Sequence, residues 1–140
     1  MKPVDQTILA VTDDGLDANG VPGNCYQACL ASVMEDSLEN IPHIAEMSYT
    51  WWLNAHAWAH SRGLIDTFLG IDDKKLYDEL REIGDVVGVI GSGPSPRGNF
   101  YHAVVLDSDT LEIVHDPHPS RSGVTQVEGL EVIWKPKEKK

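Results

Sequence analysis

In the first half of the chain, apolar and small residues recur at helical spacing. Within residues 25–34, small side chains alternate with Tyr26, Leu30 and Val33, which is typical of a tightly packed central helix. Residues 13–24 come directly before it and are rich in glycine and proline, which indicates a loop. Because asparagine is a favoured N-cap residue, we expect Asn24 to cap this helix.

Two further helices are predicted, over residues 48–62 and 72–83. In the first of them, tryptophan and alanine recur three and four positions apart, and Gly63 follows as a C-cap. The second begins with two aspartates, which suit a helix N-terminus. Its predicted apolar stripe consists of Leu76, Leu80 and Ile83. The tryptophans of the other helix, which we expect in the core, are Trp51, Trp52 and Trp58.

From residue 86 onward, the pattern changes to that of β-strands. β-branched residues gather in four short segments that are separated by turn residues. The predicted strands are residues 86–90, 101–106, 111–115 and 127–134. Helices followed by an antiparallel sheet predict an α+β fold in which helices and strands form separate layers.

The length of 140 residues fits a single domain, and no repeat, low-complexity run or linker divides the chain. We expect one domain over residues 1–140. Its N-terminal segment and loop would take residues 1–20, and residues 135–140 would form a flexible basic tail.

Charge narrows the range of partners. Four of the 11 basic residues lie in the last six positions, which leaves residues 1–134 with 7 basic against 21 acidic side chains. Because nucleic acids and anionic membranes attract basic surfaces, this acidity argues against both as partners. It favours a cationic substrate or partner instead.

The N-terminus and the cysteines bear on location. The first 15 residues hold one lysine and a short apolar patch followed by two aspartates, which fits neither a signal peptide nor a membrane span. Cys25 and Cys29 are too few for the disulfide framework of a small secreted domain. We therefore expect a cytoplasmic protein.

Cys25 is the first candidate for chemistry. A glycine-rich loop delivers it to the first turn of a helix, where free backbone N–H groups and the helix dipole favour a thiolate of lowered pKa. The alternative is a small residue that is simply packed in the core. Cys29, one turn later, could form a protective disulfide with Cys25, although burial is the plainer interpretation.

His102 and Asp116 are candidates for a base and its orienting carboxylate. If the turn between two predicted strands is centred on Asp109, these two residues face each other across the hairpin. Directly opposed side chains point to the same face, so the carboxylate can hold one ring nitrogen and leave the other free to meet a thiol. A one-residue change of register would separate them. The alternatives are a strand-end histidine and a turn-forming aspartate.

These residues lie in three stretches that resemble papain-like cysteine peptidases. The stretches are Gly23-Asn24-Cys25-Tyr26-Gln27-Ala28-Cys29, residues 95–105 around His102, and Val114-His115-Asp116-Pro117-His118-Pro119. The similarity covers roughly residues 21–134. It is greatest to small members from bacteriophage and bacterial genomes, and looser to the peptidase domains of bacteriocin-exporting transporters.

The resemblance implies a papain-like fold, with a central helix that carries the cysteine packed on a C-terminal antiparallel sheet. It also implies Cys25 as nucleophile, His102 as base and Asp116 as orienter, in the family's order along the chain. An oxyanion hole would combine the Cys25 backbone N–H with a side-chain amide upstream. In this chain the residue six positions before Cys25 is Asn19, which we take as that amide, with Asn24 and Gln27 as alternatives.

Other signals are weaker. His56 and His60 stand four positions apart, and His115, Asp116 and His118 form a cluster. Neither set resembles a complete metal site, and we expect no metal or cofactor.

Residues 91–98 form a glycine-rich loop without the lysine of a phosphate cradle, so we place this loop beside a cleft. The expected substrate-binding residues are Tyr26, Arg97, Gly98 and Tyr101. Arg97 could bind a substrate carboxylate or remain a solvated loop cation.

The sequence therefore predicts a thiol hydrolase that cleaves an amide or isopeptide bond, in a peptide or a protein, through an acyl-enzyme. An acyl or γ-glutamyl transferase would use the same three residues. A non-catalytic binding or inhibitor protein on the same fold, for instance one encoded by a phage, is the alternative outside enzymes. The sequence does not indicate an oligomeric state.

Overall fold

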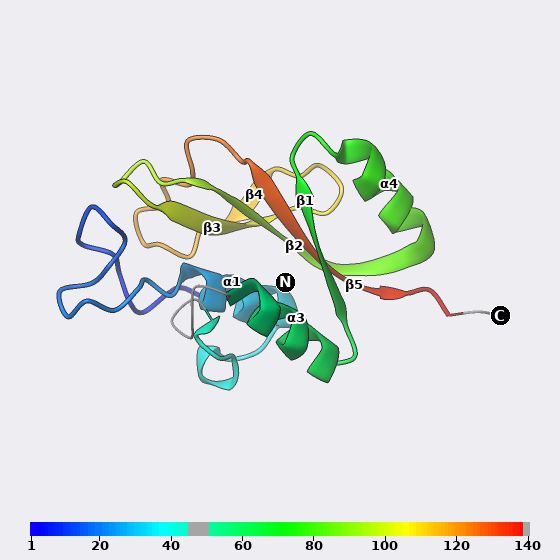
Figure 1. The fold of residues 1–140 in the computed structure, drawn as a ribbon, viewed down its shortest axis with the longest axis horizontal. Helices are drawn as coiled ribbons and strands as arrows, with labels where there is room; N and C mark the ends of the chain where they lie inside the picture. The colour runs from blue at the N-terminus through cyan, green and yellow to red at the C-terminus, as the bar shows by residue number, and fades with distance from the viewer. Residues whose placement is uncertain (45–50, 139–140) are drawn as a thin grey trace.

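A computed structural model describes residues 1–44 and 51–138 of the chain. Within these residues, five strands form one antiparallel sheet in the order β1-β5-β2-β3-β4 (Figure 1). The elements, in chain order, are α1 (Cys25–Met34), the 3-10 helix η1 (Leu38–Asn40), α3 (Trp51–Ser61), β1 (Ile65–Gly70), α4 (Lys74–Ile83), β2 (Gly84–Pro94), β3 (Tyr101–Leu106), β4 (Ile113–His115) and β5 (Gly129–Pro136). The α+β class predicted from the sequence is confirmed.

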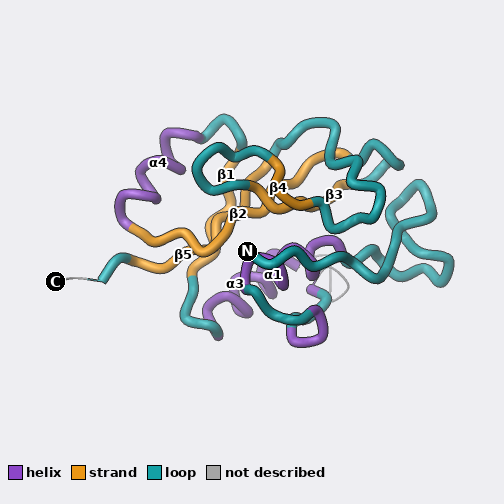
Figure 2. The backbone as a smooth tube through the Cα atoms, turned by 180° about the vertical axis from the view of Figure 1, so that it is seen from behind, coloured by secondary structure: helices purple, strands orange, loops and turns teal. Residues whose placement is uncertain are grey.

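The sheet carries a hydrophobic core on each face. Helices α1 and α3 lie against one face, where α1 packs on β3 and β2 and α3 packs on β1, whereas α4 packs on β2 from the other face. Ala103 and Val105 of β3 belong to the first core, and Val104 and Leu106 belong to the second. Figure 2 shows the same arrangement from behind, with α4 apart from α1 and α3. Helices and strands therefore lie in separate layers, as predicted, with helices on both faces of the sheet.

Helix α1 begins and ends where the sequence predicted, but Asn24 does not cap it with its side chain. The Asn24 side-chain oxygen instead accepts hydrogen bonds from the backbone N–H groups of Thr7 and Ile8, at 3.0 and 2.8 Å. The side chain is buried and ties the N-terminal segment to the start of the helix. Asn24 therefore positions residues 6–8 rather than stabilising a free helix end.

The second predicted helix corresponds to α3, and residues 48–50 of the prediction lie outside the described residues. Gly63 has a φ of 73°, and it and Leu64 donate backbone hydrogen bonds to the last turn of α3, so the predicted C-cap is confirmed. Trp51 and Trp58 pack against the core beneath the sheet. Trp52 is 46% exposed, so its predicted burial is wrong.

The predicted apolar stripe of the third helix is also wrong. In α4, Leu76 and Ile83 are 52% and 62% exposed, whereas Tyr77 and Leu80 are buried. The Tyr77 hydroxyl donates a hydrogen bond to the backbone carbonyl of Ser108. An aromatic ring that also carries a polar end rotates the buried face of the helix by one position relative to the aliphatic pattern.

Of the predicted strands, residues 101–106 match β3 and the other three differ at their ends. β2 continues to Pro94, so half of the predicted glycine-rich loop is a strand, and β4 is two residues shorter at its start than predicted. β5 runs to Pro136, which places Lys135 and Pro136 in the sheet rather than in a flexible tail.

The sequence prediction missed β1, which lies between α3 and α4 and pairs with β5 along its full length. Only Asp66 of its six residues is buried, so the strand lacks the alternation of apolar and polar residues that would reveal it. The order along the chain is therefore not helices followed by strands. Within the described residues, no helix combines the length and the apolarity needed to cross a bilayer.

Candidate active site

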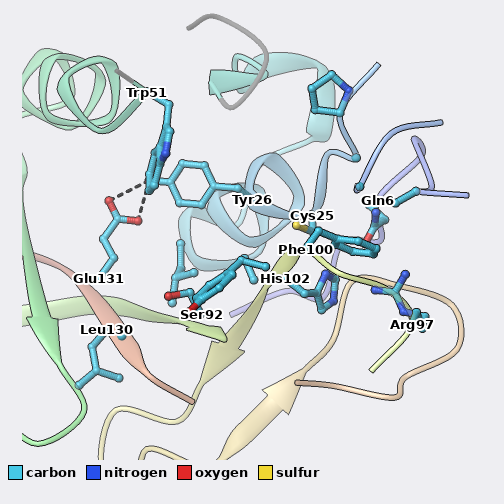
Figure 3. A pocket seen from close by; sticks show the side chains of 18 of the residues that line it. Gln6, Cys25, Tyr26, Trp51, Ser92, Arg97, Phe100, His102, Leu130 and Glu131 are labelled. Atoms are coloured by element: carbon cyan, nitrogen blue, oxygen red, sulfur yellow. Dashed lines mark hydrogen bonds between the residues drawn. The ribbon is translucent and has the colours of Figure 1, made fainter. Parts of the chain in front are cut away.

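A cavity of about 560 Å³ lies where the start of α1 meets β3, the N-terminal segment and the loop after β2. Cys25, His102 and Arg97 all line it, and Figure 3 shows these side chains on its walls. Residues far apart in the sequence therefore converge on one pocket. The walls also include aromatic rings from α1 and α3 and the carboxyl group of Glu131 on β5.

Cys25 is the first residue of α1 and is partly exposed. Cys25 lines the pocket together with His102 and Ala103 of β3, so the thiol faces the same cavity as the strand that carries His102. The nearby backbone amides of Ala103 and Tyr26 act to lower its pKa. Burial raises the pKa of the thiol, and these two amides and the charge of Arg97 only partly offset it. The expectation of a lowered pKa is wrong for the free protein, because the cost of burying a thiolate exceeds the benefit of the helix start.

His102 and Asp116 form a buried pair in which the two groups are 3% and 5% exposed. The ring Nε2 of His102 lies 2.6 Å from Oδ1 of Asp116. Burial lowers the pKa of His102 and outweighs the opposing effect of the carboxylate, so the ring is neutral at pH 7. With its proton on Nε2, the ring keeps an unprotonated Nδ1 as a base.

The Asp116 carboxylate has two further donors. Its Oδ1 accepts the backbone N–H of His118 at 2.9 Å, and its Oδ2 accepts that of Gly123 at 2.7 Å. Burial acts to raise the pKa of Asp116, but the hydrogen bonds from His102 and these amides prevail and leave it lowered. The carboxylate is therefore ionised and fixed in orientation.

The His102–Asp116 contact arises from a register different from the predicted one. The hairpin pairs Val105 with His115 and Leu106 with Ile113, with an irregularity between the two pairs. Asp116 therefore lies just beyond the end of β4 and is not a cross-strand neighbour of His102 in the ladder. Its backbone hydrogen bonds, rather than the hairpin register, direct the carboxylate to the ring.

None of the three expected amide donors lines the pocket. Asn19 is exposed on the loop before α1. Asn24 holds the N-terminal segment, and the Gln27 amide donates to the backbone carbonyls of Leu38 and Ile41, at 3.1 and 2.7 Å. All three residues are therefore occupied elsewhere or lie too far away, which corrects the expectation.

Gln6 is the amide that lines the pocket, and the sequence analysis missed it. It is 8% exposed, and its Nε2 donates a 2.8 Å hydrogen bond to the carbonyl of Ile8, which leaves a second N–H on the same nitrogen. A long loop separates Gln6 from Cys25, so a search limited to positions just before the cysteine passes over it. Gln6 lies between Asp5 and Thr7 in the sequence, so no local pattern marks it as a pocket residue.

The expected substrate-binding residues divide into two groups. Tyr26, Arg97 and Tyr101 line the pocket, and Tyr101 is 63% exposed at its rim. Gly98 is not among the lining residues. A Cβ at Gly98 would lie 2.5 Å from the Phe100 ring, so this glycine makes room for Phe100, which does line the pocket.

Glu131 adds a buried acid to the pocket wall, which the sequence did not indicate. The Tyr26 hydroxyl lies 2.6 and 2.8 Å from its two carboxyl oxygens (Figure 3). Burial raises the pKa of Glu131 to about 8, and the neighbouring carboxyl group of Asp66 adds to the rise, while the Tyr26 hydrogen bond opposes it. Asp66 in turn bonds to His56. Glu131 is therefore mostly protonated at neutral pH.

Cys29 is fully buried in α1, as the plainer interpretation expected, and both cysteines are free thiols. Over residues 1–44 and 51–138, the structure contains no group of three or more His, Cys, Asp or Glu side chains placed to hold a metal ion. Comparisons with protein-family models, with curated proteins and with solved structures find no match to this chain.

Proposed function

We propose that the protein is a thiol hydrolase, a cysteine peptidase or amidase, in which Cys25 is the nucleophile, His102 the general base and Asp116 the orienting carboxylate. The observation that carries this proposal is the buried His102–Asp116 pair in the pocket that Cys25 lines. Asp116 holds the proton on Nε2, so Nδ1 remains as the acceptor for the thiol proton. The resemblance to papain-like peptidases supports the same assignment.

In the proposed reaction, the Cys25 sulfur attacks the carbonyl carbon of an amide while its proton passes to Nδ1 of His102. The backbone N–H of Cys25 and the side-chain N–H of Gln6 stabilise the oxyanion. The imidazolium then gives its proton to the leaving nitrogen, the C–N bond breaks, and a thioester remains on Cys25. Water, deprotonated by His102, attacks the thioester and releases the carboxylic acid and the thiol.

The raised pKa of Cys25 defines how the base must act. Because the thiol is protonated at neutral pH in the free protein, proton transfer has to accompany attack. A neutral His102 suits that role, since an imidazolium could not accept the proton. The proposal therefore needs no preformed thiolate. A reducing compartment such as the cytoplasm would keep both cysteines as the free thiols that are present.

Alkylation by iodoacetamide tests the base directly. Comparison of Cys25 with Cys29 is not sufficient, because Cys29 is slow through burial alone. We expect His102→Ala to slow alkylation of Cys25 at pH 7 by about tenfold or more, since the thiol loses its proton acceptor. His60→Ala, which removes an exposed histidine of α3, is the matched control and should change nothing.

Peptide mass mapping would give the rate at each cysteine. An unchanged Cys25 rate in His102→Ala would contradict the proposal and favour a binding protein without catalysis. If alkylation does depend on His102, partition of an acyl-enzyme between water and added amines would distinguish a hydrolase from an acyl or γ-glutamyl transferase.

A further inference from the structure

Arg97, which lines the pocket, carries an unused pair of hydrogen-bond donors. Its Nε and Nη2 nitrogens are buried, and neither has a hydrogen-bond partner among the described residues. Its guanidinium also forms no ion pair within this part of the chain. Buried charged donors without partners are costly and rare, so this pair indicates a site that a ligand completes.

The geometry of these two nitrogens identifies the ligand's chemistry. The N–H bonds on Nε and Nη2 point in parallel from one edge of the planar guanidinium, and a carboxylate accepts both at once. The guanidinium carbon lies 5.7 Å from the centre of the Phe100 ring, which gives the cation a flat support. The edge is thereby held in one orientation before any ligand arrives.

Arg97 lies beside the proposed nucleophile and base. Arg97 lines the pocket together with Cys25 and His102, as Figure 3 shows. Its charge acts to lower the pKa values of both groups, so it lies within electrostatic reach of the nucleophile and the base. The nearby Asp116 carboxylate is already engaged with His102 and two backbone amides. It is therefore not available to neutralise Arg97.

We propose that Arg97 forms a carboxylate subsite, so that the substrate is an amide with a carboxylate group close to the scissile bond. This inference rests on the proposed function for the identity of the scissile bond. The carboxylate has two chemical sources: the C-terminal group of the leaving amino acid, or the α-carboxylate of an acyl group that is linked through its side chain. Both present the same pair of oxygens to Nε and Nη2.

Binding to a Cys25→Ser protein tests the subsite without any reaction. The probes are N-acetylglycine and its carboxamide, N-acetylglycinamide, followed through the NMR signals of the His102 ring and the Arg97 side chain. We expect the carboxylate to bind at least about tenfold more tightly than the amide, and Arg97→Gln to remove that difference. Arg97→Lys keeps the charge without the paired donors and should retain only part of it.

Arg81→Gln is the matched control, because it removes a cation of α4 that forms an exposed ion pair with Asp109. It should leave the preference for the carboxylate probe intact. Thermal unfolding checks that each variant folds. If Arg97→Gln does not fold, Arg97→Lys replaces it as the test variant. Equal binding of the two probes to Cys25→Ser would overturn the inference. Inorganic phosphate that binds as tightly as N-acetylglycine would also overturn it, since the site would then select charge and not a carboxylate.

Reaction at Cys25 gives a second readout that separates the two proposals. The Cys25 sulfur attacks iodoacetate and iodoacetamide at the same CH₂ carbon and displaces iodide from both, but only iodoacetate carries a carboxylate. We expect the ratio of their rates at Cys25 to fall about tenfold or more in Arg97→Gln. If binding depends on the carboxylate but alkylation of Cys25 does not depend on His102, the subsite is supported and the hydrolase proposal is rejected. An unchanged ratio, with alkylation that still depends on His102, would reject the subsite alone.

Turnover distinguishes the two sources of the carboxylate. γ-Glutamyl-p-nitroanilide places it on the acyl side, and N-benzoylglycylglycine places it on the leaving side. Each is compared with its own carboxamide. A preference for the carboxylate in either pair supports the subsite and names the source, whereas preference in neither pair would contradict the inference.

Discussion

His102 remains a neutral base because burial disfavours its charged form more than Asp116 favours it. The proposed reaction requires that neutral form, so its rate should rise with pH as the ring loses its proton. Since the pKa of His102 is lowered from 6.5, the midpoint of the rise should lie below pH 6.5. The pH dependence of ester hydrolysis by the protein would measure it.

Asp116→Asn should change this profile in two ways. The carboxylate acts to raise the pKa of His102, so its loss should move the rise to still lower pH. An asparagine also permits the wrong ring tautomer, which should lower the rate by about 100-fold or more. Asp109→Asn, at an exposed turn, is the control. An unshifted profile with an undiminished rate would show that Asp116 does not orient the ring.

Gln6 is the residue that most clearly separates the proposed oxyanion hole from the one expected from sequence. Gln6→Ala should reduce turnover by about 100- to 1000-fold, the usual effect of removing one oxyanion donor. Asn19→Ala should have no effect, because Asn19 is exposed and does not line the pocket. Steady-state rates of both variants would decide which residue is the oxyanion donor. A large loss in Asn19→Ala with none in Gln6→Ala would identify Asn19 as the donor.

Glu131 should make stability depend on pH in an unusual direction. Its pKa is raised from 4.5 to about 8, so the folded state holds a proton that the unfolded state releases. The free energy of unfolding should therefore fall as pH rises from about 4.5 to about 8 and then level off. Each unit of pKa shift corresponds to about 1.4 kcal/mol.

Glu131→Gln keeps the shape of the side chain and removes the titration. Its stability relative to the wild type should increase as the pH rises from 5 to 8, which chemical denaturation at both pH values would measure. Glu128→Gln, at a half-buried position before β5, should show no such trend, because the pKa of Glu128 is lowered and its carboxylate stays ionised over this range. A constant difference between Glu131→Gln and the wild type would mean that Glu131 ionises normally.

The contact between α1 and β2 sets the position of the helix that carries Cys25. A Cβ at Gly88 of β2 would lie 2.5 Å from side-chain atoms of Val33, so this glycine allows the helix to lie close to the sheet. Gly88→Ala should destabilise the fold by about 1–3 kcal/mol, as overpacking of cores does. It should also reduce turnover by displacing the helix.

Gly70→Ala is the matched control for this substitution. Gly70 also lies in a strand, but its nearest contact would be an ordinary 3.5 Å to Asp73. Thermal unfolding of both variants gives the comparison, with Gly70→Ala close to the wild type. Equal stability of the two variants would show that the close approach at Gly88 does not matter.

Element boundaries could be predicted where local pattern and packing agree. α1 and β3 combine small or β-branched residues with clear breakers beside them, and their observed bounds match the prediction. In contrast, β1 exists because its backbone pairs with β5, a partner about 60 positions away in the sequence. The buried face of α4 is likewise set by the sheet on which it packs.

Over the whole molecule, the three residues of the proposed catalytic group were more predictable than the side chains around them. Cys25, His102 and Asp116 could be identified because their residue types and order are uncommon by chance. Gln6 and the unpaired edge of Arg97 depend on how a loop and the N-terminal segment return to the pocket. Local sequence patterns carry little information about such long-range placement.

The overall charge, from which a cationic substrate or partner was expected, opposes the approach of a carboxylate substrate. The chain has a net charge of −11, which repels anions at long range. A carboxylate substrate would therefore depend on Arg97 at short range. Added salt should weaken the long-range repulsion and speed association of such a substrate.

Trapping of an acyl-enzyme tests the central proposal most directly. The protein is mixed with p-nitrophenyl acetate, quenched in acid within the first turnover, and analysed by intact mass and peptide mapping. We predict one acetyl group per chain on Cys25, with a matching burst of p-nitrophenol, and a greatly reduced burst in His102→Ala. Release of p-nitrophenol without an adduct on Cys25, or an undiminished burst in His102→Ala, would contradict the account.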